Sequence, residues 1–336
     1  LKHPLSATRL DAYLTCPLRY YYERLCAIAP IDEVNEDDDP AAVGVLLHNV
    51  LRDFYAPAVG KAVRRNLVKR RMRGIVREAL PSIRGGQMIF IARAGAGINE
   101  LTHLPDSLRA FCAGRPLPPE SAAMLSVTGP ERLGMFLRAQ PEQTEVLSLE
   151  EEYDAEIRVG GRIRRLTGNL DRVDWREQED PEGALDEGAV ILDYKTGRIK
   201  ALRPDIWADA AFWDALDPEK AAEAASEPDP EHDFLPIMAQ RIPTVQLLYY
   251  CYLYGQATGK PVLDAAFVAL GEDGGERPLF GKGMTIEERE RALSLIPRLI
   301  GFILLHMELC PEFRPREGAH CRWCSWRNVC IISSQQ

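Results

Sequence analysis

Alternation of apolar and polar positions predicts consecutive β-strands in the middle of the chain. Residues 149–159 and 162–175 follow this period of two, and the Gly160-Gly161 dipeptide between them suits a two-residue hairpin turn. A polar loop at 178–188 separates them from a short apolar run at 190–195. The three segments predict a meander in which Asp171 lies on the strand beside that of Asp193.

The last of these strands, in the segment AVILDYKTG at 189–197, ends in an acid and a base. Successive side chains of a strand alternate between faces, so Asp193 and Lys195 share one face while Leu192 and Tyr194 take the other. A carboxylate and an ammonium group would then point into one site. An exposed strand also carries such a pair as a solvated contact, so the functional interpretation needs support from the rest of the chain.

Helical spacing of apolar residues predicts two helical segments before the strands. Residues 6–25 form the first, with Ser6 as its N-cap and a break at Cys16-Pro17, because proline lacks the backbone donor and restricts the residue before it. Residues 43–55 form an amphipathic helix with His48 beside its apolar face. The expected buried stripe of this helix is Leu47, Val50, Leu51 and Phe54.

Three further elements are predicted after the strands. Residues 244–255 read as a helix that carries Gln246 and Tyr250 one turn apart on one face. Residues 263–270 read as a short apolar strand, and residues 293–309 as an amphipathic helix that leads into a cluster of cysteines.

Two long segments, 61–145 and 198–242, carry less information about structure and function. Residues 61–84 are expected to be a basic helix, because eight Lys and Arg residues and no acid fall between Lys61 and Arg77. Residues 85–145 are expected to be mostly helices with loops. The segment 198–242 is rich in acidic, Ala and Pro residues, with Trp207, Phe212 and Trp213 as packing anchors.

Composition limits the class of protein. The chain has 336 residues, 46% hydrophobic and 27% charged, as in globular proteins. We found no run of about 18 uncharged apolar residues and no signal peptide pattern, so we expect a cytoplasmic protein without a spanning helix. A net charge of −9 argues against non-specific coating of nucleic acid. The start at Leu1 rather than Met predicts a part excised from a longer protein.

Eight cysteines without a secretion signal do not predict a disulfide framework. Cys321, Cys324 and Cys330 are separate from the others, because they follow the spacing Cys-x2-Cys-x5-Cys. This spacing predicts a metal site.

The strands and helices together match the needs of metal-assisted phosphodiester cleavage. That reaction requires carboxylates that hold one or two divalent cations, and a lysine can stabilise the developing charge. Asp171 and Asp193 on adjacent strands, with Lys195 two residues further, provide these groups. His48 on the neighbouring helix could complete the metal shell.

At this point the sequence resembles the PD-(D/E)XK nuclease superfamily, in particular the RecB-like branch with an iron–sulfur cluster, as in the AddB subunit of AddAB helicase–nucleases. The resemblance extends from Leu5 to Cys330 and rests on six motifs in the family's order. They are SATRLDAYLTCP (6–17), GVLLH (44–48), GNLDRVD (168–174), DYKTG (193–197), QLLYY (246–250) and the terminal cysteines.

The resemblance implies roles for individual residues. Metal ligands would be His48, Asp171, Asp193 and the carbonyl group of Tyr194, and Lys195 would be the catalytic lysine. Gln246 and Tyr250 match the family's Gln-x3-Tyr helix and would touch the substrate. Arg172 and Asp174 are expected to pair with each other rather than to bind metal.

Cys16 would be the fourth ligand of a [4Fe–4S] cluster, together with Cys321, Cys324 and Cys330. A four-cysteine zinc site is the chemical alternative, since Cys-x2-Cys suits both metals. Either centre would join residue 16 to residue 330 and stabilise the fold, so the expected role is structural.

The implied fold is an α/β PD-(D/E)XK core with a mixed central sheet flanked by helices. We expect one nuclease domain over residues 1–336, with core segments 5–60, 146–197 and 243–270, inserts 61–145 and 198–242, and a C-terminal helix and Fe–S motif at 285–330. The implied partner is an AddA-like helicase subunit. The two inserts match nothing specific in the family, and we expect them to shape a channel or to dock such a partner, with the basic strip 61–77 as the candidate contact for a single strand.

The implied activity is a Mg2+- or Mn2+-dependent deoxyribonuclease, an exonuclease or endonuclease that cuts single strands delivered by the helicase during DNA end processing and repair. A stand-alone CRISPR-associated Fe–S nuclease is the alternative within this class. A nuclease-dead scaffold that only binds DNA is the alternative from another class, although intact His48, Asp171, Asp193 and Lys195 argue against it.

Overall fold

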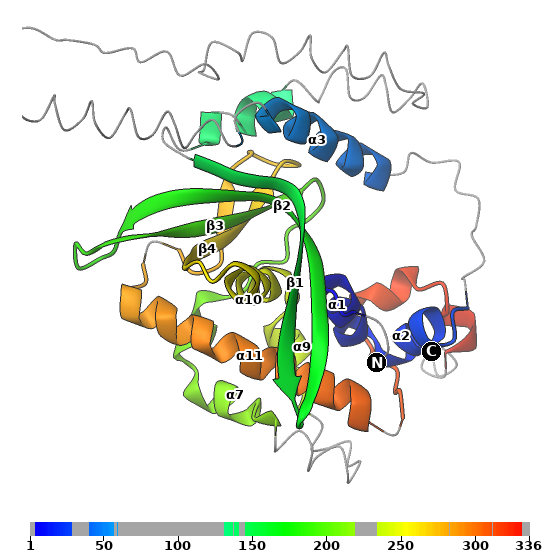
Figure 1. Cartoon of the computed structure of the whole chain (residues 1–336). Coiled ribbons are helices and arrows are strands. Elements are labelled where there is room, and N and C mark those ends of the chain that lie inside the picture. Colours follow the sequence, from blue (N-terminus) through cyan, green and yellow to red (C-terminus); the bar gives the residue numbers. More distant parts are fainter. Residues whose placement is uncertain are drawn as a thin grey trace, which may run out of the picture.

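The computed structural model describes residues 4–28, 40–56, 59, 131–136, 138–140, 145–218, 234–281, 283–310 and 312–330. The expected basic helix at 61–84, and most of the segment 85–145, lie outside the described residues. Within the described part the chain forms one mixed sheet with helices on both faces (Figure 1). The sequence-based expectation of an α/β fold with a mixed sheet is confirmed.

The sheet has five strands in the order β1-β2-β3-β4-β5. The β1–β2, β2–β3 and β4–β5 pairs are antiparallel, and β3 and β4 are parallel. The three predicted strands of the meander are longer than their alternation indicated, and β5 was not predicted. The strands are β1 (Glu145–Val159), β2 (Arg162–Glu179), β3 (Leu185–Lys195), β4 (Val262–Ala269) and β5 (Glu276–Pro278).

The hairpin between β1 and β2 turns at the predicted dipeptide. Gly160 and Gly161 have φ values of 54° and 73°. A type I′ turn requires positive φ at both central residues, and glycine adopts this conformation without steric cost. The turn fixes the register in which Val159 lies opposite Arg162.

The two faces of the sheet build two separate hydrophobic clusters. Ile191 of β3 belongs to the larger cluster, formed with helices α1 (Ala7–Thr15), α10 (Gln246–Thr258) and α11 (Ile286–Leu309). Leu192 and Tyr194, which point the other way, belong to the smaller cluster under α3 (Pro40–Tyr55) and the helical residues 131–136. In Figure 1, α3 lies on one side of the sheet and α10 and α11 on the other. The predicted alternation along β3 is confirmed.

Helix α3 buries Leu47, Val50 and Leu51, three members of its predicted stripe. The side chain of Phe54, the fourth member, lies outside the described part of the chain.

Helix α10 (Gln246–Thr258) lies against the sheet next to α11 (Ile286–Leu309). Helix α11 begins before the expected residue 293, because Thr285 and Glu288 form a capping box at its start. By length and composition α11 could cross a membrane, but 56% of its most apolar 18-residue window is buried inside the protein. A buried helix of this kind is typical of a protein core.

The segment 198–242 contributes to the core where it is described. It contains the 3-10 helix η5 (Pro204–Ala208) and the helices α7 (Ala210–Ala215) and α9 (Leu235–Arg241). The rings of Trp207 and Trp213 stack at 5.5 Å, and Phe212 and Trp213 are buried. The three expected packing anchors are therefore confirmed.

The two ends of the described chain lie side by side (Figure 1). Helix α1 (Ala7–Thr15) is capped by Ser6 and ends at Cys16, as predicted from the Cys16-Pro17 break. It continues into α2 (Pro17–Tyr20) and a π-helical turn, η1 (Tyr21–Leu25). The C-terminal turns η6 (Ala319–Trp323) and η7 (Arg327–Val329) pack here, where Trp326 contacts Tyr22 with ring centres 5.0 Å apart.

Candidate active site

Three side chains from α3, β1 and β2 converge at one edge of the central strands. Nδ1 of His48 lies 3.5 Å from Oδ2 of Asp171 and 3.6 Å from Oε1 of Glu150. Potential ligand atoms of the three residues all lie within 4.8 Å of one another. One imidazole and two carboxylates are suitable ligands for a divalent cation, so this group could hold a metal.

Glu150 is the member of this group that sequence reasoning missed. It stands on β1 in the run Glu150-Glu151-Glu152, and nothing in the pattern separates these three acids. In the structure Glu150 has a φ of 47°, a left-handed conformation that non-glycine residues rarely adopt. Its Oε2 also accepts a hydrogen bond of 3.0 Å from Nδ2 of Asn169. The unusual backbone accompanies its placement beside Asp171.

The backbone of Tyr194 connects the strands at the site. Its N–H donates a 2.7 Å hydrogen bond to Oδ2 of Asp171, and its carbonyl oxygen lies 3.0 Å from Nε2 of His48. This carbonyl is the one that the resemblance implies as a metal ligand. Here it accepts from the imidazole, which holds α3 against β3.

A second group surrounds Asp193 on the α10 face of the sheet. Nζ of Lys195 lies 2.5 Å from Oδ2 of Asp193, and Nε2 of Gln246 donates to Oδ1 over 2.7 Å. The Gln246 amide also donates to the hydroxyl group of Tyr250 over 3.0 Å. The sequence-predicted Asp193, Lys195, Gln246 and Tyr250 are thus in direct contact.

Asp193 is not one of the three residues in the metal-capable group. Its two oxygens face Lys195 and Gln246, while Asp171 faces His48. The two groups are nevertheless neighbours, since Asp193 and Asp171 lie on paired strands and Tyr194 touches both His48 and Asp171. The assignment of Asp193 as a metal ligand stays a prediction.

Electrostatics at the site favour bound protons in the metal-free protein. Burial disfavours the charged imidazolium, but hydrogen bonds with Asp171 and Glu150 raise the pKa of His48 to about 10. Burial and the neighbouring charge of Asp171 raise the pKa of Asp193 to about 7, against the lowering effect of Lys195. A cation bound between these groups would compete with the protons.

Arg172 and Asp174 form a buried ion pair away from these groups. Both side chains have 0% exposure, and Nε of Arg172 lies 2.6 Å from Oδ1 of Asp174. Arg176 also pairs with Asp174, over 2.8 Å. The guanidinium group of Arg172 stacks on Tyr55, the last residue of α3, at 4.0 Å from the ring centre. The expected structural pair therefore anchors the helix that carries His48.

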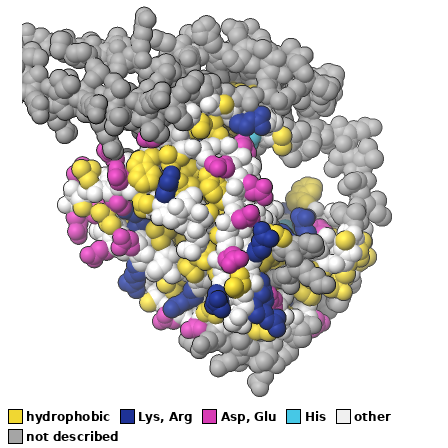
Figure 2. All heavy atoms as spheres, in the orientation of Figure 1, with side chains coloured by type: hydrophobic (Ala, Val, Ile, Leu, Met, Phe, Trp, Pro, Cys, Tyr) yellow, Lys and Arg dark blue, Asp and Glu magenta, His cyan; other side chains and the backbone are white. Residues whose placement is uncertain are grey.

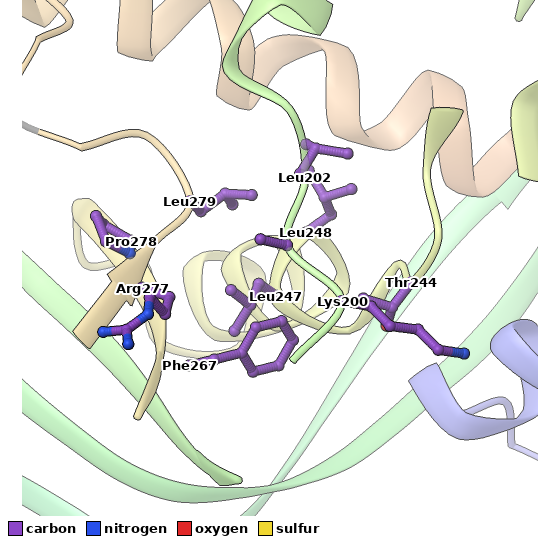
Figure 3. A pocket seen from close by; sticks show the side chains of 10 residues that line it. Lys200, Leu202, Thr244, Leu247, Leu248, Phe267, Arg277, Pro278 and Leu279 are labelled. Atoms are coloured by element: carbon purple, nitrogen blue, oxygen red, sulfur yellow. The ribbon is translucent and has the colours of Figure 1, made fainter. Parts of the chain in front are cut away.

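A shallow hollow, open to solvent, is lined by Phe267 and by residues of α10 such as Leu247 (Figure 3). Nζ of Lys195 is 5.2 Å from the centre of the Phe267 ring, which lines this hollow. The rim carries Lys200 and Arg277, and the floor is apolar. The apolar lining residues are Ala201, Leu202, Leu247, Leu248, Phe267, Pro278 and Leu279.

Surface charge is mixed on the face shown in Figure 2. Lys and Arg side chains gather near the end of the β1–β2 hairpin, where Arg158, Arg162 and Arg165 are exposed. The predicted basic strip 61–77 lies outside the described residues, so its position relative to the site stays untested.

The four expected cysteine ligands lie where the two ends of the chain meet. The N–H of Arg316 lies 3.5 Å from Sγ of Cys16, and the carbonyl oxygen of Arg316 lies 3.8 Å from Sγ of Cys321. The N–H of Cys324 donates to the carbonyl of Cys321, and Cys330 directly follows η7. The structure thus brings Cys16 and Cys321 to the same residue, although they are far apart in sequence.

Comparison with known proteins identifies the family of this chain. Nine chains of solved structures match, among them one described as "Crystal structure of SSO0001", which is 12% identical, with coverage of 99% of this chain and 88% of that one and a TM-score of 0.32. A comparison with curated proteins found no match. A family model described as the PD-(D/E)XK nuclease superfamily matches residues 4–331. The chain therefore belongs to the PD-(D/E)XK nuclease superfamily.

Proposed function

We propose that this protein is a Mg2+- or Mn2+-dependent deoxyribonuclease of the RecB-like branch. The observation that carries the proposal is the convergence of His48, Glu150 and Asp171 within ligand distance of one another, next to the Asp193–Lys195 pair. Carboxylates, an imidazole and a lysine in this arrangement fit phosphodiester hydrolysis. The superfamily match agrees with this chemistry.

Each group has a role in the proposal. His48, Glu150, Asp171 and Asp193 would hold the divalent cation, which when bound lowers the pKa of a water molecule and neutralises charge on the phosphate. Lys195 would stabilise negative charge at the reacting phosphate. The amide of Gln246 orients the Asp193 carboxylate through its 2.7 Å hydrogen bond. The hydroxyl group of Tyr250 accepts a second hydrogen bond from that amide and holds it in place.

The test is cleavage of end-labelled single-stranded DNA with Mg2+ or Mn2+. Lys195→Ala and Asp193→Ala should each lower the rate by about 100-fold or more, because each removes a group at the reacting centre. Lys200→Ala is the matched control, since Lys200 is an exposed lysine on the rim of the adjoining hollow and contacts neither carboxylate of the strands. Equal rates in all four proteins would refute the mechanism.

The four cysteines are proposed to bind a [4Fe–4S] cluster. Support comes from the thiol groups of Cys16 and Cys321, which both lie against Arg316 at the junction of the chain ends. A four-cysteine zinc site is the chemical alternative, since Cys-x2-Cys suits both metals.

The wider context is also part of the proposal. A single domain is supported by one hydrophobic cluster that draws residues from Leu5 to Met307. We propose an AddB-like role in which a helicase partner delivers single strands to the site during DNA end repair. A stand-alone nuclease and a DNA-binding scaffold remain the alternatives, and activity of the isolated chain on free DNA separates them.

A further inference from the structure

Asp11 joins two helices that are far apart in sequence. Its Oδ1 accepts a 2.7 Å hydrogen bond from the N–H of Val245, and its Oδ2 accepts a 2.5 Å hydrogen bond from Oγ1 of Thr244. Asp11 stands in the middle of α1, whereas Val245 immediately precedes α10. One carboxylate of α1 thus holds the two residues that lead into α10.

The N-cap residue of helix α10 makes no side-chain hydrogen bond to the helix. The first N–H groups of a helix need acceptors, which an N-cap Ser, Thr, Asp or Asn normally supplies. Val245 occupies the N-cap position, and its apolar side chain cannot accept a hydrogen bond. Asp11 of α1 instead accepts the N–H of Val245 itself, and its negative charge is favourable near the positive end of the helix.

The contacts continue from Asp11 to the active-site carboxylate. Oγ1 of Thr244 donates to Asp11 and accepts the N–H of Gln246 over 3.2 Å. Gln246 is the first residue of α10, and its side chain donates to Oδ1 of Asp193 over 2.7 Å. A continuous chain of hydrogen bonds therefore runs from Asp11 through Thr244 and Gln246 to Asp193.

We propose that Asp11 is a positioning residue for the nuclease reaction, which acts through Thr244 to hold the Gln246 amide on Asp193. This inference rests on the proposed function of the site. Because α1 ends at Cys16, the helix that carries a proposed cluster ligand also sets the first turn of the active-site helix.

Hydrogen-bond polarity makes Asp11→Asn an informative substitution. An asparagine has nearly the same shape, but its Nδ2 group is a donor. If Nδ2 replaces Oδ2, the Thr244 hydroxyl oxygen faces two donors, Nδ2 and the N–H of Gln246, and its own proton loses its acceptor. Thr244→Val breaks the same link at its second step, and Thr244→Ser restores it.

Asp209→Asn is the matched control. Asp209 likewise holds a backbone N–H at the start of a helix and a second side chain, because its Oδ1 accepts the N–H of Phe212 in α7 and its Oδ2 accepts from Nη1 of Arg241, each over 2.9 Å. It has no contact with the Asp193 group. A loss that comes only from disturbed helix capping should therefore also appear in Asp209→Asn.

The experiment measures kcat on single-stranded DNA and the Mn2+ dissociation constant. We expect Asp11→Asn and Thr244→Val to lower kcat by about 10- to 100-fold, because small misplacements at a reacting centre have effects of this size. Thr244→Ser should stay close to the wild type, and Asp209→Asn within about twofold, as expected for sites without a shared partner.

A double-mutant cycle with Gln246→Ala provides the decisive comparison. If Asp11 acts through Gln246, Asp11→Asn causes little further loss in the Gln246→Ala background, whereas Asp209→Asn has the same effect in both backgrounds. Multiplicative losses for Asp11 would overturn the inference. A wild type that binds Mn2+ but cuts no DNA would refute the proposed function without deciding the role of Asp11. The same double-mutant cycle, measured on the Mn2+ dissociation constants, would then decide that role.

Discussion

The backbone N–H of Tyr194 donates a 2.7 Å hydrogen bond to the side chain of Asp171, across two paired strands. This bond orients the carboxylate toward His48, whose Nδ1 lies 3.5 Å from the same Oδ2 atom. One oxygen thus serves both the sheet and the candidate metal site. The geometry of the site is therefore tied to the pairing of β2 with β3.

Glu150 should contribute to metal binding. Glu150→Gln keeps the size of the side chain but removes a negative ligand, so we expect Mn2+ affinity to fall by about tenfold or more in titration calorimetry. Glu152→Gln is the control, because Glu152 lies two residues further on the same strand and accepts from the hydroxyl group of Thr167 instead. Equal affinities in the two variants would show that Glu150 is not a ligand.

Metal binding should release protons. With a pKa of about 10 for His48 and about 7 for Asp193, both groups bind protons in the metal-free protein at pH 6. The cation needs the unprotonated forms, so Mn2+ affinity should rise with pH between 6 and 9, by up to about tenfold per pH unit for each proton released. Calorimetry in buffers of different ionisation enthalpy counts these protons.

His48→Gln separates the two contributions to this release. The variant should release fewer protons than the wild type near pH 8, where Asp193 is already ionised. A release that is independent of pH, or unchanged in His48→Gln, would contradict the assignment.

The buried Asp174 should make the free energy of unfolding depend on pH in the acidic range. Burial alone would raise its pKa, but the charges of Arg172 and Arg176 hold the pKa below the usual value of an aspartate. The stabilisation is therefore fully present above the unfolded-state pKa and is lost as the pH falls through the lower folded-state value. Asp174→Asn should cost about 3–5 kcal/mol of unfolding free energy at pH 7, since it leaves Arg172 buried without its partner.

Urea denaturation at pH 7 and at pH 3 checks this expectation, and the difference between Asp174→Asn and wild type should shrink at the lower pH. Asp205→Asn serves as the control, because the Arg203–Asp205 pair is 81% and 58% exposed. Exposed ion pairs of this kind contribute little to the free energy of unfolding. A deficit that stays constant with pH would exclude the ion pair as its cause.

The cysteine site should stabilise the junction of the chain ends. Cys16→Ser should lower bound iron and the midpoint of thermal unfolding, by about 5 °C or more, because binding of a structural metal centre contributes to folding free energy. Cys26→Ser is the control, since Cys26 is an exposed cysteine only ten residues further along. Full iron content in Cys16→Ser, or zinc alone in the wild type, would refute the cluster proposal.

Local patterns predicted much of the fold. The period of two in β1, β2 and β3 and the glycine pair at 160–161 indicated the meander, and the same period separated Asp193 and Lys195 from Tyr194. These features depend on neighbouring residues, which a sequence displays directly. The start of α11 also had a local signal, the Thr285-x-x-Glu288 capping box, which the apolar spacing alone overlooked.

Features that depend on distant contacts could not be predicted in this way. Asp11 meets Thr244 across 233 positions, and no periodicity connects them. Glu150 differs from Glu151 and Glu152 by its left-handed backbone, and it lies between the β1 residues that pair with Arg172 and Leu170 of β2. Sequence reasoning therefore found the residues carried by recognisable motifs and missed those whose role arises from tertiary packing.

The alternation along β3 has a consequence for how the protein can be assayed. A slip of β3 by one residue against β2 would exchange the faces of all its side chains, so that Asp193 would enter the apolar layer under α3 and Tyr194 would face Gln246. Such a molecule could keep most of its secondary structure and still lack the site. The fraction of chains that bind Mn2+ would then report how many molecules have paired these strands in the native register. Circular dichroism, which measures secondary structure, would not distinguish the two forms.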